Sequence, residues 1–427
     1  MSTVKHPARL IPVSGIGNTT EAERRAASAF LAVLSIVRDL SIALLGHTKA
    51  PRAKKAEVET YAEVQFTTKG KTDRPDGLIE VAYGKRTWTA LVEVKTKSDR
   101  LRAEQVNRYW SLAKAKKYNH VLTISNEIAP APGEHPTSGL RFNKASSVQI
   151  SHLSWSEILL TAIRIREHTP VEDREQAWLL NELIRYLEHP ASGVLAFDDM
   201  GQAWVRVRDA ARARNLSRRT DGVADVVNRW NRLIRFAGLS LSSEVGENVK
   251  TRFDNEREQI ATLCERGVLE ATLHVPKTAG DMHVQADLRA GQIAAAMTVR
   301  APEDKGSTGR ISWLVRQIKD VSPGLSIESY PKNSQIPTIA SLGAVREDRS
   351  ALLGDKRRQP HRFRLVSRKK MGAGRKAGPA SKSFIGSVLG EIEDFYEKVV
   401  QEIDEWRPPV PKRKPLPETA PPDGPSG

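Results

Sequence analysis

A β-hairpin predicted over residues 81–88 constrains the fold more than any other feature of this chain. Runs of β-branched and aromatic residues flank Gly84-Lys85. A two-residue loop with glycine at its first position favours a type II′ turn. If that turn forms, Tyr83 lies opposite Arg86, and the register of the two strands is fixed along their whole length.

The same register predicts a cluster of polar side chains near the open end of the hairpin. Asp76 falls opposite Glu93, and strand alternation places Lys95 on the same face as Glu93. Opposed Cβ atoms in an antiparallel pair lie about 4.5–5.5 Å apart, so the two carboxylates repel each other. A divalent cation relieves that repulsion, and Mg²⁺ binds carboxylate oxygens at about 2.0–2.1 Å. We therefore expect a hydrolytic metal site here.

These residues resemble the motif of the PD-(D/E)XK, or restriction-endonuclease-like, nucleases. A second motif downstream is similar to the Q-x-x-x-Y helix of the RecB-like and phage-exonuclease branch, whose two side chains share one helix face. The matching residues are Pro75-Asp76, Glu93-Val94-Lys95, and Gln105 with Tyr109. The resemblance covers roughly residues 20–165. The combination in this order is much more specific than E-x-K alone.

The resemblance implies an α/β fold with a restriction-endonuclease-like α-β-β-β-α-β core within residues 19–168. The sequence supplies helices and strands in that order. A capping box of Thr20 and Glu23 predicts the start of a helix that ends at Gly46. A strand over 59–66, the hairpin, a helix over 101–117 and a strand over 120–125 follow. Another strand at 148–153 and two helices at 155–167 and 171–188 are predicted beyond them.

The resemblance also implies roles for the motif residues. Asp76 and Glu93 would ligate Mg²⁺ (or Mn²⁺), together with the carbonyl oxygen of Val94. Lys95 would position the attacking water or help to deprotonate it. From the neighbouring helix, Gln105 and Tyr109 would support the site.

Three further residues are candidates, each with a plainer alternative. Family members often add an upstream acidic residue, for which we favour Glu59 over Glu63; either could also be an exposed strand carboxylate. The Q-x-x-x-Y branch often has a metal-binding histidine, and His47 is the candidate, although a surface histidine is the commoner explanation. Arg108 could contact phosphate or be a solvated charge.

Composition favours a polyanionic partner. The 427 residues contain 67 Lys and Arg against 51 Asp and Glu, a formal net charge of +16, which indicates nucleic acid, with DNA favoured, unless the protein is merely basic. The single cysteine, Cys264, excludes disulfides within the chain and cysteine-rich zinc motifs. Without a secretory signal or a long apolar run we expect no membrane association and a cytoplasmic location.

The rest of the chain is predicted to form further domains. Residues 1–18 are expected to be loose, and residues 169–265 to form a helical region. An α+β domain is predicted over 266–406, with strands at 268–275, 283–288 and 293–299, and residues 407–427 read as a disordered proline-rich tail. The helical region contains arginines that suit phosphate contacts or a solvated helix face equally well: Arg212, Arg214, Arg218, Arg219, Arg232 and Arg235.

Two features of the α+β domain suggest interactions. A dense basic run that includes Arg368, Lys369 and Lys370 could follow a phosphate backbone. An apolar stripe on a helix over 383–406 could pack on its own domain or form a homodimer. The leading hypothesis is a metal-dependent nuclease, by analogy in bacterial defence or DNA processing. The alternative is a non-catalytic DNA-binding or scaffold protein on the same fold.

Overall fold

The computed structural model describes residues 10–11, 18–68, 71–131, 133–141, 145–169, 171–318, 321–354 and 358–407. Most of the predicted loose N-terminus and proline-rich tail therefore lies outside the described residues. The fold is mixed α/β with mixed sheets. The chain forms two compact units. The first comprises 1–277, 281–297 and 367–397, and the second comprises 278–280, 298–366 and 398–427. The predicted boundaries near 168 and 265 fall inside the first unit.

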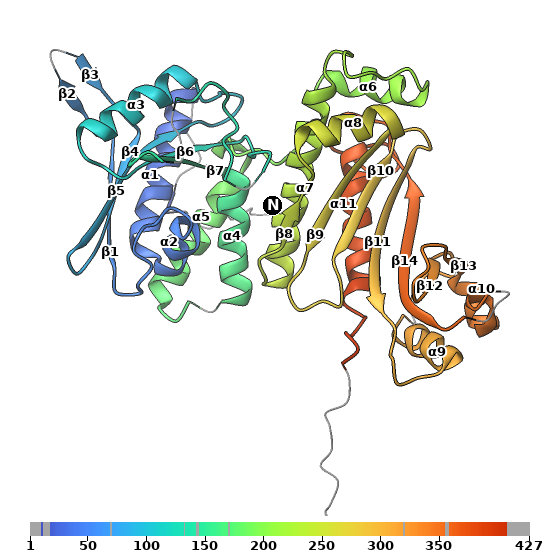
Figure 1. Ribbon diagram of the computed structural model, residues 1–427. Coiled ribbons are helices and arrows are strands. Elements are labelled where there is room, and N and C mark those ends of the chain that lie inside the picture. Colours follow the sequence, from blue (N-terminus) through green and yellow to red (C-terminus); the bar gives the residue numbers. More distant parts are fainter. Residues whose placement is uncertain are drawn as a thin grey trace, which may run out of the picture. The chain divides into compact units, whose positions relative to one another are not determined.

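A five-stranded sheet with the order β1-β4-β5-β6-β7 lies in the N-terminal part of the first unit (Figure 1). Its strands are β1 (Glu57–Ala62), β4 (Gly77–Tyr83), β5 (Arg86–Val94), β6 (His120–Ser125) and β7 (Gln149–Ser154). Strands β1, β4 and β5 are antiparallel neighbours, whereas β5, β6 and β7 run parallel. Helix α3 (Ala103–Ala115) provides the crossover between β5 and β6.

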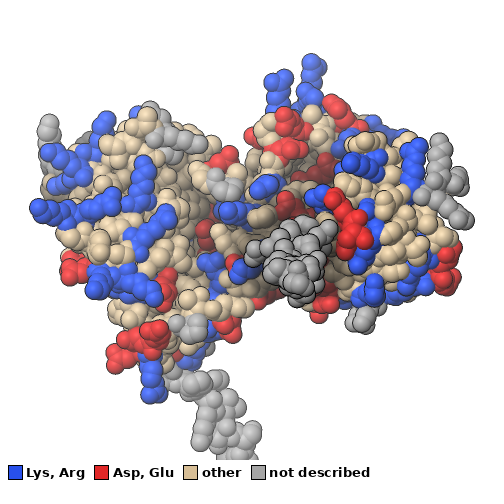
Figure 2. Space-filling model, turned by 60° about the horizontal axis from the view of Figure 1, so that its bottom comes forward, with Lys and Arg blue, Asp and Glu red and all other residues tan. Residues whose placement is uncertain are grey.

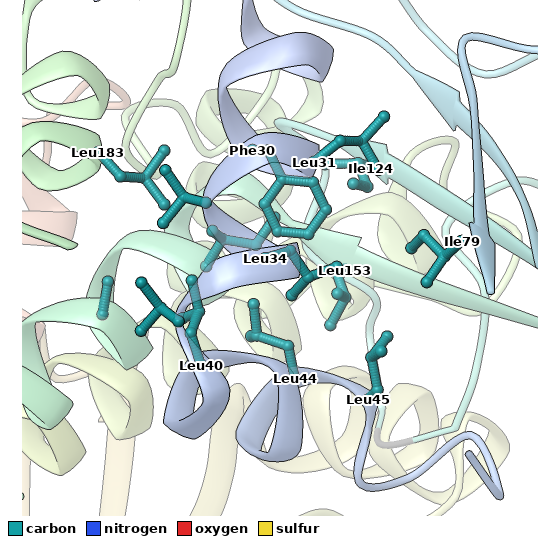
Figure 3. Close-up of a cluster of buried hydrophobic side chains, with 14 of the residues drawn as sticks. Phe30, Leu31, Leu34, Leu40, Leu44, Leu45, Ile79, Ile124, Leu153 and Leu183 are labelled. Atoms are coloured by element: carbon teal, nitrogen blue, oxygen red, sulfur yellow. The ribbon is translucent and has the colours of Figure 1, made fainter. Parts of the chain in front are cut away.

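Apolar side chains cover both faces of this sheet. On one face they pack with helices α1 (Thr19–Ile36), α2 (Arg38–Leu45), α4 (Trp155–His168) and α5 (Arg174–Leu187), as Figure 3 shows for part of the cluster. On the other face Leu91 packs with α3 residues such as Val106. The alternation along β5 sends Val92 and Val94 into the first cluster and Leu91 into the second. The end of β5 is therefore anchored in two cores.

The predicted hairpin register is confirmed. Tyr83 pairs with Arg86, and the ladder continues in the same register to Gly77 opposite Val92. Gly84 has φ of +59°, while Lys85 is not among the residues with positive φ, as a type II′ turn requires.

The N-terminal helix differs from its prediction. It bends by 108° at Val37 and forms two helices. The N-cap of α1 is Asn18, whose side chain accepts a hydrogen bond from the Glu21 N–H. The predicted capping box of Thr20 and Glu23 is thus wrong, because the N-cap is Asn18 and the N3 position falls on Glu21.

A short hairpin, β2 (Phe66–Thr68) and β3 (Lys71–Asp73), is inserted between β1 and β4. The strand predicted over 59–66 therefore ends earlier, at Ala62, and is followed by Glu63 in a left-handed conformation with φ of +54°. The inserted hairpin leads the chain directly to Asp76 at the start of β4.

The remainder of the first unit combines helices with antiparallel strands. After η1 (Pro190–Ser192) come α6 (Ala203–Arg212), α7 (Val223–Val245), β8 (Lys250–Arg252), α8 (Glu256–Arg266), β9 (Val268–His274), β10 (Met282–Asp287), β11 (Gln292–Arg300) and α11 (Phe384–Phe395) with its π-helical extension Tyr396–Val400. Strands β8 to β11 are sequential neighbours in a sheet. The three strands predicted between 268 and 299 are confirmed within one residue at each end.

Helix α11 buries the apolar stripe for which self-association was the alternative. Phe384, Ile385 and Ile392 are almost fully buried, and the Phe384 ring stacks near Trp204 and Trp230 at 4.1 and 6.1 Å between centroids. The apolar stripe is therefore buried within the chain and gives no support to the suggested homodimer.

The second unit contains α9 (Ser307–Gln317), β12 (Ser326–Pro331), β13 (Thr338–Ser341), α10 (Leu342–Glu347), η2 (Arg349–Leu352) and most of β14 (Pro360–Lys370). Its strands follow the order β13-β12-β14. Much of the basic run forms the regular strand β14.

No single helix in the described ranges is long and apolar enough to cross a membrane; only the bent pair α1 and α2 passes that test together, by length and composition.

Candidate active site

The carboxyl end of β5 and the start of β4 bring the first motif residues together. Glu93 is the penultimate residue of β5 and Asp76 immediately precedes β4. The Val94 N–H donates a hydrogen bond of 2.7 Å to Asp76 Oδ2. Lys95 extends β5 by one residue, because its N–H donates to the Ile124 carbonyl on β6 at 2.8 Å. Backbone hydrogen bonds on both sides of β5 thus fix the Cα positions of Asp76, Glu93 and Lys95.

The Lys95 ammonium joins two carboxylates. Its Nζ lies 2.8 Å from Glu93 Oε1 and 3.3 Å from Glu23 Oε2, and it donates a 3.1 Å hydrogen bond to the Val94 carbonyl. Glu93 is 1% exposed and Glu23 is 8% exposed. The second acidic partner therefore comes from α1.

Sequence reasoning missed Glu23, because it was assigned to a capping box. A usable signal was present: Glu23 shares its helix face with Ala26, Ala27 and Phe30, all of which are buried. A carboxylate at the position i−3 or i−4 from core residues points into the protein. Such a residue needs a partner, because an unpaired buried charge is strongly unfavourable.

Helix α3 contributes the second motif. Gln105 Nε2 donates a 2.6 Å hydrogen bond to Glu93 Oε1, so Gln105 contacts the cluster directly. The Tyr109 hydroxyl donates to the Arg74 carbonyl at 3.0 Å, which supports the segment that leads into Asp76. Arg108 forms an ion pair with Asp73 at 2.9 Å.

Burial raises the pKa values of the acidic groups, and the charge of Asp76 adds to this effect at Glu93 and Glu23. Burial raises the pKa of Asp76, against hydrogen bonding from Val94 and the charge of Lys95. Burial and then the charge of Asp76 raise the pKa of Glu93 to about 7. Burial also raises the pKa of Glu23. In all three carboxylates the cost of burying the charge outweighs the stabilisation that the charge of Lys95 provides.

Lys95 responds in the opposite sense. Its burial disfavours the ammonium, but the charges of Glu93, Glu23 and Asp76 outweigh this effect and raise the pKa of Lys95. The side chain is therefore a permanent cation at neutral pH, able to neutralise negative charge but unable to accept a proton.

The oxygen atoms of this cluster suit a hard divalent cation. Asp76, Glu93 and the Val94 carbonyl adjoin one another, and Glu23 Oε1 is buried with no hydrogen-bond partner among the described residues. A buried carboxylate oxygen without a hydrogen-bond partner is suited to bind a cation. Within the described ranges no three His, Cys, Asp or Glu side chains already surround a common point; the Lys95 ammonium lies between Glu93 and Glu23.

The other candidates lie outside the cluster. Glu59 is exposed on β1, where it accepts a 2.8 Å hydrogen bond from the Tyr61 hydroxyl, and Glu63 pairs with Arg24 at 3.1 Å. The expectation for Glu59 is corrected: the extra acid in the cluster is Glu23. His47 follows α2. Burial is the main cause that lowers the pKa of His47, and the charge of Arg52 is the second.

The basic residues on β14 have acidic neighbours of their own. Lys369 pairs with Glu391 at 3.1 Å and also with Asp394, while Arg368 and Lys370 are exposed at the end of the strand. Figure 2 shows Lys and Arg intermixed with Asp and Glu over the face it displays. The net charge of +16 is therefore not gathered into one uniform patch on that face.

Comparisons of the chain with protein-family models, with curated proteins and with solved structures gave no match.

Proposed function

We propose that this protein is a metal-dependent nuclease that hydrolyses phosphodiester bonds in nucleic acid, with DNA as the favoured substrate. The observation that carries the proposal is the buried ion pair of Glu93 with Lys95 beside Asp76, which the Val94 N–H holds, with Gln105 bonded to Glu93. Burial raises the pKa of both carboxylates, and the charge of Asp76 raises that of Glu93 further. Such carboxylates are costly to keep, and function is the common reason for keeping them.

The arrangement of elements supports a restriction-endonuclease-like core. A helix, three antiparallel strands, a crossover helix and a parallel strand follow one another as α1, β1, β4, β5, α3 and β6. This is the order that the sequence resemblance implies. The hairpin β2–β3 and the break at Val37 are local additions to that order.

The chain's own residues have definable tasks in this chemistry. Asp76, Glu93 and the Val94 carbonyl would hold Mg²⁺ or Mn²⁺, with Glu23 nearby; the ion, when bound, polarises phosphate and lowers the pKa of water. Lys95 offsets the negative charge that builds on the phosphorus centre, because its raised pKa keeps it protonated. Gln105 fixes the orientation of the Glu93 carboxylate.

One observation favours a second candidate, a non-catalytic nucleic-acid-binding or scaffold protein. The Lys95 ammonium already bridges Glu93 and Glu23, so the fold has an internal cation that partly replaces a metal. In that reading the cluster is a structural ion-pair network. The raised pKa of Glu93 weighs against it, since an optimised network would lower that value.

Incubation of purified protein with circular and linear DNA, in Mg²⁺, Mn²⁺ or EDTA, tests the proposal. We expect metal-dependent cleavage that is absent from the Glu93→Gln and Lys95→Ala variants. The Glu104→Gln variant, altered at an exposed position on α3, is the matched control and should cleave normally. Cleavage in EDTA, or full activity of Glu93→Gln, would refute a metal-dependent nuclease. Binding of DNA without cleavage under every condition would favour the scaffold.

A further inference from the structure

Helix α7 carries three arginines, two of which contact the loop that follows β6 in the sheet of the candidate active site. Arg229, Arg232 and Arg235 are spaced by three, which places them along one side of the helix. Arg232 lies 3.7 Å from Glu127, just beyond the end of β6. Arg235 Nη1 donates a 2.6 Å hydrogen bond to the Ala129 carbonyl in the same loop.

This loop and the candidate site share one edge. Strands β5 and β6 are parallel, with Glu93 opposite Thr123, so Lys95 and Glu127 both follow the carboxyl ends of their strands. Asn126 Nδ2 donates a 2.9 Å hydrogen bond to the Lys97 carbonyl, which ties the two loops together. Arg100, three residues after Lys97, is exposed and close enough to Arg232 for the two charges to oppose each other.

Arg232 is the least satisfied member of the row. Its neighbours are held by carbonyls: Arg229 by Asp199 at 2.9 Å, and Arg235 by Ala129. In the described part of the chain Arg232 has one ionic partner, Glu127, beyond hydrogen-bond distance, and its Nε is buried without an acceptor.

A buried guanidinium without hydrogen-bond acceptors is energetically unfavourable, and a bound anion would supply those acceptors. Burial and the charges of Arg229 and Arg100 lower the pKa of Arg232, against the opposing charges of Glu127 and Asp225. The Arg232 side chain is 19% exposed, so a ligand reaches it from solvent. Guanidinium groups bind phosphate through two parallel hydrogen bonds.

We propose that Arg232 and Arg100 bind a backbone phosphate of a polynucleotide whose neighbouring segment enters the candidate active site. The inference rests on the proposed function for that segment, but the phosphate site itself is independent of cleavage. Arg235 holds α7 against the loop through Ala129, and Arg229 fixes the preceding turn of α7 through Asp199. Glu127 occupies Arg232 in the free protein and gives way to the phosphate.

Because Glu127 competes with phosphate for Arg232, substitutions of these two residues should change the affinity for a polynucleotide in opposite directions. Arg232→Gln removes a phosphate contact and weakens binding. Glu127→Gln removes the competing carboxylate and strengthens binding. A purely structural ion pair would lower thermal stability in both variants and leave binding alone. The Arg100→Gln variant adds a change at an exposed position that leaves the fold intact.

The test is fluorescence anisotropy with labelled duplex and single-stranded oligonucleotides in EDTA, on a Glu93→Gln background that prevents cleavage. We expect Arg232→Gln and Arg100→Gln to bind about tenfold more weakly. Each should reduce the salt slope of log K by about 0.9 on duplex or about 0.7 on single strands. Arg257→Gln, at an exposed arginine on α8, is the matched control and should bind normally. Thermal unfolding checks that each variant is folded.

Several outcomes would overturn the inference. These are unchanged binding by both arginine variants, an equal loss in Arg257→Gln, or weaker binding by Glu127→Gln. Inorganic phosphate and a mononucleotide serve as competitors; if they bind at Arg232 while the oligonucleotides do not, the site is not for a polynucleotide. If the arginine variants bind more weakly but the wild-type protein never cleaves, the proposed nuclease fails and the phosphate site stands. If the wild-type protein cleaves but the arginine variants bind normally, the phosphate site fails and the nuclease stands.

Discussion

Gln105 on α3 donates a 2.6 Å hydrogen bond to Glu93 on β5. The crossover helix thereby orients a carboxylate on the preceding strand, which joins the two sequence motifs in one contact. Gln105 itself is half-buried, so its side chain does not hold the core together.

We expect Gln105→Ala to lower cleavage by about 10- to 100-fold, the usual effect of losing a residue that orients a metal ligand. The fold should remain stable. Single-turnover kinetics and thermal unfolding check both parts. Gln105→Glu should be as inactive or worse, because it adds a like charge beside Glu93. Normal cleavage by Gln105→Ala would show that Glu93 needs no support from α3.

Glu23 should separate activity from stability. Its buried Oε1 lacks a hydrogen-bond partner and burial raises its pKa, so Glu23→Gln removes an unfavourable charge. We expect an unchanged or higher melting temperature, with cleavage reduced about tenfold or more because Lys95 loses a positioning partner. The exposed residues Glu59 and Glu63 provide controls: Glu59→Gln and Glu63→Gln should leave cleavage intact. Loss of activity in Glu59→Gln, with normal Glu23→Gln, would reverse our assignment of the third acid.

Glu93 should make stability depend on pH near neutrality. Burial and Asp76 raise its pKa from 4.5 to about 7 in the folded protein. The protonated form therefore stabilises the fold; this contribution is complete below about pH 4.5 and is lost as the pH rises through about 7. We expect the wild-type melting temperature to fall over that window more than that of Glu93→Gln.

Mg²⁺ offers a second measurement on the same group. A cation that binds the deprotonated carboxylate should raise the melting temperature more at about pH 8 than at about pH 6. In Glu93→Gln this pH-dependent gain should disappear. An equal Mg²⁺ effect in both proteins would indicate that the ion binds elsewhere.

A buried histidine network should govern stability at acidic pH. His152 Nε2 donates to the Glu127 carbonyl at 2.7 Å, so its Nδ1 accepts from the Thr123 hydroxyl at 2.9 Å. Burial lowers the pKa of His152 to about 3 and that of His135 to about 4. The neutral rings thus stabilise the fold above about pH 6.5, and this contribution is lost as the pH falls through those values.

Thr123→Val removes the hydroxyl at the centre of this network. We expect a loss of about 1–3 kcal/mol in the free energy of unfolding at neutral pH, because His152 Nδ1 is left buried and unpaired. Urea unfolding followed by circular dichroism gives the value. Thr87→Val, at an exposed position on β5, should change stability by less than about 0.5 kcal/mol. Equal effects of the two substitutions would contradict a role for the network.

Two glycines test the hairpin turn by conformation alone. A Cβ added to Gly84 or to Gly390 would meet no atom within 4 Å, but only Gly84 has positive φ, +59°. Gly84→Ala should therefore destabilise the protein by about 1–2 kcal/mol. Gly390→Ala, inside α11, should stabilise it by about 0.5–1 kcal/mol. A stabilising Gly84→Ala would mean that the turn is not of the type II′ class.

Local sequence rules were enough to predict the register of the hairpin and the contact of Glu93 with Lys95. Both depend on short-range rules: a two-residue turn leaves one pairing, and strand alternation then assigns every side chain to a face. The strands from 268 to 299 followed from alternation and glycine punctuation in the same way.

The distant residues that complete the cluster could not be predicted locally, because tertiary packing selects them. Glu23 reaches Lys95 from a helix 72 positions earlier, and Arg232 meets Glu127 across more than a hundred residues. Lys369 likewise pairs with Glu391 on α11. Local pattern gives a charged residue its helix face or strand face, but its partner depends on how elements far apart in the chain pack. That packing is set by the whole apolar core, and no single stretch of sequence contains it.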